Sequence, residues 1–99
     1  MDKLRTISPV DGSTYVERRL ASDDEIRAAL ERAAKAQQDW KRQPVEARAR
    51  QLSAFVDAFV AKRDEIALEL TWQMGRPIRY TPGEVRGFEE RARNMIAIA

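Results

Sequence analysis

The stretch Leu20-Ala21-Ser22-Asp23-Asp24-Glu25-Ile26 divides the chain into two parts of different character. Ser22 and Glu25 have the spacing of a capping box. In this motif the Ser22 hydroxyl accepts a hydrogen bond from the Glu25 amide, and the Glu25 carboxylate accepts one from the Ser22 amide. The acidic residues at 23–25 also suit the positive end of a helix dipole. A helix is therefore predicted to begin here, with a different structure before it.

The residues before this boundary favour extended structure. Arg5-Thr6-Ile7 and Ser13-Thr14-Tyr15-Val16 are short β-favouring runs, and a Pro-x-Asp-Gly turn at residues 9–12 separates them. We predict a β-hairpin within residues 1–20, running from about Lys3 to Leu20. An isolated two-stranded hairpin is marginal in water, so we expect it to lie on another element or to extend another sheet.

The residues after the boundary have helical periodicity. Helices are predicted over 22–42, over 44–75 as one kinked helix or a helix pair, and over 81–99. Pro44 ends the first helix and opens the second, and Gly75 is a stop signal. Thr81-Pro82-Gly83-Glu84 has the pattern of a second capping box.

Each predicted helix carries an apolar stripe with a spacing of three and four residues. The stripes are Ile26, Leu30, Ala33, Ala34, Gln37 and Trp40; Leu52, Phe55, Val56, Phe59 and Val60; Ile66, Leu70 and Met74; and Val85, Phe88, Ala92, Met95 and Ile96. The predicted fold class is mainly α with a short N-terminal β-hairpin. Residues 1–99 make one domain, which we expect to be truncated because the last stripe continues to Ala99 without a stop signal.

Composition excludes several kinds of active site. The chain has no Cys and no His, so it supplies no thiolate nucleophile, imidazole base, disulfide or typical zinc site. Its 18 Lys and Arg against 16 Asp and Glu leave a net charge of +2. It has no signal-peptide pattern and no apolar run of the ~18 residues that a membrane span needs. We expect a cytoplasmic protein without a membrane partner.

The remaining polar residues form no convergent set. The acids Asp23-Asp24, Asp64-Glu65 and Glu89-Glu90 are neighbours on helices, where adjacent side chains diverge by about 100°. The aromatic residues are interpreted as packing or interface residues: Tyr15, Tyr80, Trp40 and Trp72. We therefore predict no catalytic, cofactor-binding or metal-binding residue.

The basic residues do not predict a nucleic-acid surface. Arg18-Arg19, Lys41-Arg42 and Lys62-Arg63 fall on different elements, and acids are interleaved with them. The glycines at 12, 75, 83 and 87 match neither a dinucleotide fingerprint nor a phosphate loop.

The order of several weak motifs resembles the opening segment of the aldehyde dehydrogenase superfamily. The motifs are Ile7-Ser8-Pro9-Val10-Asp11-Gly12, Leu20–Ile26, Ala33–Trp40, Pro44–Ala49, Lys62–Ala67 and Leu70–Pro77. Two positions depart from the family pattern: Ser8 stands where Asn is common, and Gln73-Met74 replaces the usual Glu-Thr. Some members bind a monovalent cation at positions that here would be Thr6, Ile7 and Gln73. Because Gln73 is neutral, we assign no metal site to them.

This resemblance implies a parent enzyme that oxidises an aldehyde to a carboxylic acid with NAD or NADP, using a Cys nucleophile and a Glu base. None of those catalytic residues matches a position here, and the Rossmann strands are expected beyond Ala99. The segment would then be the N-terminal part of a Rossmann-type α/β cofactor domain, with a structural role and no activity or cofactor of its own. Its expected partner is the rest of the parent chain, in a homo-oligomeric enzyme. The alternatives are a stand-alone helical interaction domain and, behind it, a nucleic-acid binder.

Overall fold

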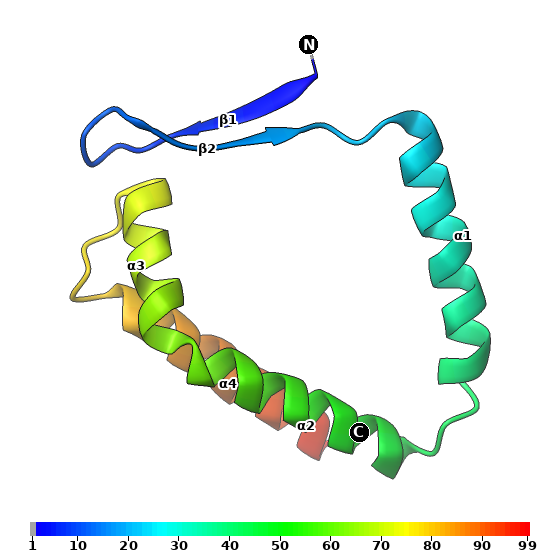
Figure 1. Cartoon of the computed structure of the whole chain (residues 1–99). Coiled ribbons are helices and arrows are strands. Elements are labelled where there is room, and N and C mark those ends of the chain that lie inside the picture. Colours follow the sequence, from blue (N-terminus) through cyan, green and yellow to red (C-terminus); the bar gives the residue numbers. More distant parts are fainter. Residues whose placement is uncertain (1) are drawn as a thin grey trace.

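The computed structural model describes residues 2–99, which are mainly helical with one short hairpin. The strands are β1 (Lys3–Ile7) and β2 (Thr14–Arg19), and the helices are α1 (Asp23–Trp40), α2 (Val45–Ala61), α3 (Arg63–Met74) and α4 (Thr81–Ala97). Figure 1 shows them as an open frame. The hairpin runs along the top, α1 descends on the right, α2 and α4 lie along the bottom, and α3 rises toward the hairpin turn. The predicted mainly α class with an N-terminal hairpin is confirmed.

The hairpin is antiparallel and contains one irregularity. Thr6 pairs with Val16 but Ile7 pairs with Thr14, so Tyr15 is the extra residue of a β-bulge. The turn follows the predicted chemistry, since the Asp11 carboxylate accepts a hydrogen bond from the Ser13 amide at 3.0 Å and Gly12 has a φ of 76°. Described strands form only this two-stranded sheet, and its turn lies against the end of α3.

The start of α1 is the predicted capping box. The Glu25 amide donates to the Ser22 hydroxyl at 3.2 Å, and the Ser22 amide donates to the Glu25 carboxylate at 2.8 Å. The helix ends at Trp40, two residues before the predicted limit of 42. Lys41 and Arg42 lie in the turn that follows, where the Lys41 amide still donates to the Gln37 carbonyl.

The segment predicted over 44–75 is a pair of helices that meet at Lys62. This residue ends α2 and precedes α3, with φ of −98° and ψ of 16° outside the helical range. Pro44 is the residue before α2 rather than its first helical residue, which corrects the prediction by one position. Gly75 ends α3 in the left-handed conformation, with φ of 78°, as predicted.

The predicted second capping box at Thr81-Pro82-Gly83-Glu84 is wrong. Tyr80 precedes the first helical residue, and no side chain caps this end of α4. The Thr81 hydroxyl instead donates to the Ile78 carbonyl at 3.3 Å, and the Glu84 carboxylate pairs with Arg76 at 2.9 Å. Both side chains have partners outside the motif, so the reciprocal bonds of a capping box do not form. The helix also ends at Ala97, two residues before the predicted limit of 99.

A small core lies where α4 packs against α2 and against α3. Its buried apolar residues are Val56, Ala67 and Val85, one from each helix. The Phe59 and Phe88 rings extend the contact between α2 and α4, with centroids 4.5 Å apart. The stripes predicted on α2 and α4 therefore meet, although Phe55 and Met95 stay exposed. On α3 the buried residue is Ala67, which the predicted stripe did not include, and Met74 of that stripe is 63% exposed.

The frame is far from a compact globule. Its radius of gyration is 17.6 Å, against the ~13 Å that a compact chain of this length has. The helix α1 has no buried residue, and Leu30 in the middle of its stripe is 66% exposed. The apolar stripe of α1 is therefore largely exposed, because the other described elements leave it uncovered.

Candidate functional site

The junction between the hairpin turn and α3 holds the two ends of the frame together. Ser8 is fully buried there, and its hydroxyl donates to the Trp72 carbonyl at 2.5 Å and accepts from the Val10 amide at 3.2 Å. Its backbone is also satisfied, through Ser13 and Gly12. A buried group with every hydrogen bond made fixes local geometry, so Ser8 positions the turn on α3.

The candidate cation residues of the sequence resemblance are chain neighbours of this junction. Thr6 and Ile7 end β1 directly before Ser8, and Gln73 follows Trp72 in the last turn of α3. Gln73 carries no charge, and across residues 2–99 no group of three or more acidic side chains is placed to hold a metal ion. We assign no cation site to these residues.

A second junction joins the hairpin to α1. The Arg19 guanidinium donates to both carboxylate oxygens of Glu25, at 3.0 and 2.6 Å. Together with the Ser22 amide, these hydrogen bonds lower the pKa of Glu25 to about 2. Such a carboxylate stays ionised near neutral pH and is unsuited to general acid or base work. The ion pair links the end of β2 to the first turn of α1.

Two further contacts involve arginine side chains. One joins α2 to α4, and the other lies in the connection between α3 and α4. Arg93 on α4 donates to Asp57 on α2 at 2.8 Å and to Glu89 on its own helix at 2.9 Å. These acids raise the pKa of Arg93 and leave it as a structural cation. In the α3–α4 connection, Arg79 lies over the ring of Tyr80 at 4.8 Å. Tyr80 is 50% exposed, so its interpretation as a packing residue stays a prediction.

The basic dipeptides are spread over the frame as predicted. Arg18-Arg19 lies on β2 and Lys41-Arg42 follows α1, whereas Lys62 joins α2 to α3 and Arg63 begins α3. In each dipeptide the arginine at position 19, 42 or 63 is paired with an acid. This pairing favours solvated ion pairs over a continuous surface for phosphates.

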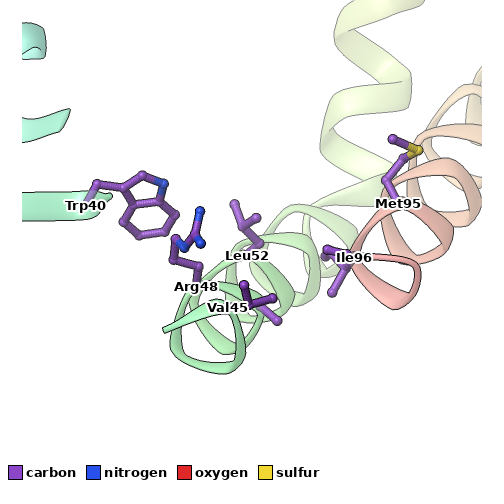
Figure 2. A pocket seen from close by; sticks show the side chains of 8 residues that line it. Trp40, Val45, Arg48, Leu52, Met95 and Ile96 are labelled. Carbon is purple, nitrogen blue, oxygen red and sulfur yellow. The ribbon is translucent and has the colours of Figure 1, made fainter. Parts of the chain in front are cut away.

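An apolar groove runs along α2 and α4, and we call it the α2/α4 groove. It comprises two adjoining cavities of about 220 and 230 Å³ that share Leu52, Met95 and Ile96. Figure 2 shows the first cavity, where Trp40 at the end of α1 points toward Arg48 and Leu52 on α2. Arg48 is its one charged lining residue, and the Arg48 Nε donates to the Gln43 carbonyl at 3.2 Å.

The described residues bring together packing and ion-pair clusters rather than a reactive set. The predicted absence of catalytic and cofactor residues stays a prediction. Sequence reasoning did not identify Ser8 or Arg93 as joining residues, because their partners lie 64 and 36 positions away. It interpreted Trp40 as a core or interface residue, and the groove beside it is consistent with an interface. Within residues 2–99, no helix is long and apolar enough to cross a membrane.

Comparison with known proteins gives a consistent result. The family model described as the aldehyde dehydrogenase family matches residues 1–99. A long-chain-aldehyde dehydrogenase of Acinetobacter is 33% identical over 75 residues, which cover 76% of this chain and 15% of that protein. Succinate-semialdehyde dehydrogenase [NADP(+)] 1 of Mycobacterium tuberculosis is 31% identical over 99 residues, covering 96% of this chain and 22% of that protein.

A third relative, 3,6-anhydro-alpha-L-galactose dehydrogenase of Streptomyces coelicolor, is 32% identical over 84 residues and covers 85% of this chain. The chain spans between 15% and 22% of the length of these three relatives. The match over residues 1–99, together with the order of motifs along the chain, shows that this chain belongs to the aldehyde dehydrogenase family.

Proposed function

We propose that this chain serves as the opening, structural segment of an NAD(P)-dependent aldehyde dehydrogenase. The parent enzyme would oxidise an aldehyde to a carboxylic acid, in the cytoplasm and as a homo-oligomer. Membership of the family over residues 1–99 supports this role, and one relative is named as an NADP(+) enzyme. Whether the parent uses NAD or NADP, and which aldehyde it takes, depends on residues outside this segment.

The observation that carries the structural role is the open surface of the frame. Among the described residues, only five are buried: Ser8, Val56, Ala67, Thr81 and Val85. A chain with 43% apolar residues ordinarily buries many more of them. The apolar stripe of α1 and the α2/α4 groove therefore suit a segment that is covered by the rest of a larger enzyme. A Rossmann-type cofactor domain is the cover that the family resemblance implies.

The described residues do not fit a nicotinamide dinucleotide. A dinucleotide ordinarily binds where a parallel strand meets a helix through closely spaced glycines. The one described sheet is antiparallel. The two glycines with the closest spacing in the sequence, Gly83 and Gly87, both lie within α4. The chain also has no Cys to act as the nucleophile of the parent reaction. Cofactor and chemistry would both belong to other parts of the enzyme.

A chimeric enzyme tests the proposal. Residues 1–99 replace the matching segment of the Mycobacterium tuberculosis succinate-semialdehyde dehydrogenase, and NADPH formation from succinate semialdehyde is followed by absorbance. We expect the chimera to be soluble and active, and the same enzyme with the segment deleted to be inactive. A chimera that folds cooperatively but forms no NADPH would contradict the proposed role.

A further inference from the structure

Arg48 differs from the other basic side chains of this chain. Among residues 2–99 it is the one Lys or Arg that is half-buried, whereas every other one is exposed. Its Nε donates to the Gln43 carbonyl at 3.2 Å. Exposed arginines such as Arg19 and Arg93 pair with acids, but within the described part of the chain the Arg48 guanidinium forms no ion pair. The cation that is least accessible to water is therefore one that lacks a counter-ion.

Arg48 lies at one end of the α2/α4 groove. It is the one charged residue that lines the first cavity of about 220 Å³, and the residues that line the second cavity of about 230 Å³ are all apolar. Figure 2 shows Arg48 between Trp40 and Leu52, with Ile96 and Met95 on the far side. The groove thus combines a cation at one end with an apolar surface along the rest.

Any cover over this end of the groove removes water from the guanidinium. A half-buried cation keeps part of its hydration, but a fully covered one has to be paired and hydrogen-bonded. A carboxylate matches a guanidinium best, because its two oxygens accept two parallel N–H bonds. The Gln43 carbonyl already occupies Nε, so the terminal nitrogens of Arg48 are the donors that remain for such a partner. Charge complementarity therefore favours a cover that is apolar and carries one acid.

The lengths of the relatives indicate where the cover comes from. The chain spans between 15% and 22% of the three relatives, so most of each relative lies outside the matched segment. Ala99 lines the same cavity as Arg48. In the proposed parent enzyme, the residues that follow Ala99 would thus begin beside the groove.

We propose that a later segment of the parent enzyme fills the α2/α4 groove with apolar side chains and places an Asp or Glu carboxylate on the Arg48 guanidinium. This inference rests on the proposed function, because the occupant belongs to the same enzyme. Arg48 is then a positioning residue. Apolar contact is non-directional, whereas a guanidinium–carboxylate pair has a fixed geometry, so the pair sets the register in which the segment docks.

Two chemical probes test the groove on the chain itself. Octanoate has an apolar tail with a carboxylate, and octyltrimethylammonium has the same tail with a cation. NMR of ¹³C-labelled methionine methyl groups follows Met95, which lines both cavities, and the exposed Met74 on α3 is the reference outside the groove. We expect the Met95 methyl to shift more than the Met74 methyl, with octanoate binding about 5-fold more tightly than octyltrimethylammonium or better.

A matched pair of variants assigns this preference to Arg48. Arg48→Met should bind the two probes about equally, because the cation of the groove is lost. Arg50→Met removes the same charge from an exposed position on α2 and should keep the preference for octanoate. The comparison excludes a general effect of net charge, which is the same in both variants.

The chimera with the Mycobacterium tuberculosis enzyme tests the occupant. Arg48→Glu would place a carboxylate against the proposed acid, so its midpoint of thermal unfolding should lie about 4 °C or more below that of Arg50→Glu. Each Asp and Glu of the later part is then changed to Lys, one at a time, in the Arg48→Glu background. We expect one of these changes to restore most of the lost midpoint, and the same change to destabilise the unmodified chimera.

The failure of this inference and the failure of the proposed function give different results. An active chimera in which Arg48→Glu and Arg50→Glu unfold at the same temperature, or in which no acid-to-lysine change restores Arg48→Glu, would overturn the inference alone. A chimera that folds but forms no NADPH would contradict the proposed function, and its unfolding midpoints would still decide the inference. Octanoate that binds Arg48→Met as tightly as the unchanged chain would overturn the inference whether or not the chimera folds.

Discussion

The Ser8 hydroxyl donates to the Trp72 carbonyl across 64 positions of the chain, and this contact closes the frame between the hairpin turn and α3. Ser8 also accepts from the Val10 amide, so one buried oxygen joins the turn to itself and to the helix. Removing a buried partner of this kind leaves polar groups unsatisfied, which costs more than a hydrogen bond contributes on average. We therefore expect the junction to be sensitive to substitution.

Ser8→Ala should lower the free energy of unfolding by about 1–3 kcal/mol, because the Trp72 carbonyl and the Val10 amide lose their partner. Urea unfolding at fixed protein concentration measures the change. Ser13→Ala is the control in the same turn, since the exposed Ser13 hydroxyl bonds only Asp11 nearby, and it should cost about 0.5 kcal/mol or less. Equal losses for both variants would show that Ser8 has no special role.

Gly75 and Gly87 should respond to alanine in opposite directions. Gly75 has φ of 78°, and an added Cβ would lie 2.9 Å from the Pro9 side chain, so Gly75→Ala should destabilise by about 1–3 kcal/mol. Gly87 lies within α4 with open space around its Cα, and Gly87→Ala should stabilise by about 0.5–1 kcal/mol. Thermal unfolding of the two variants measures both signs. A Gly75→Ala variant as stable as the unchanged chain would exclude strain at this junction.

Local sequence signals predict a feature correctly where it depends only on neighbouring residues. The capping box at Ser22, the turn at Gly12 and the stop at Gly75 depend on neighbouring residues, and the structure has all three. The capping pattern at Thr81 fails because a residue outside the motif, Arg76, binds the Glu84 carboxylate. The candidate site is hard to predict for the same reason, because its contacts involve residues far apart in the sequence. Periodicity identifies the stripe on α1 as apolar but does not identify what covers it, and the Ser8–Trp72 contact leaves no local pattern.

The start of α1 should depend on acid pH through Glu25. Hydrogen bonds from Arg19 and the Ser22 amide lower the pKa of this carboxyl from 4.5 to about 2. Its stabilising contribution is therefore complete above about pH 4.5 and is lost as the pH falls through about 2. Amide hydrogen exchange at residues 23–26, followed by NMR between pH 7 and 1.5, should show protection that declines in this window.

The Glu25→Gln variant isolates this titration from that of other carboxylates. It should show faster exchange at residues 23–26 already at pH 7, because the charged bond to Arg19 is lost. Its residual protection there should not fall between pH 4.5 and 2 beyond the change in the rest of the chain. A variant that repeats the acid transition of the unchanged chain would assign the effect to another carboxylate.

Val56 should be a costly position to truncate in the helical part of the frame. It is 2% exposed on α2, beside Phe88 and Ala92 of α4, so Val56→Ala removes buried methyl groups and leaves a cavity. We expect a loss of about 2–3 kcal/mol in urea unfolding. Leu68→Ala on α3 is the control, because Leu68 is 52% exposed and its truncation should change stability by about 0.5 kcal/mol or less. If the two variants lost equal stability, the core would not be centred on α2, α3 and α4, and the exposed surface of α3 would have to be covered in solution.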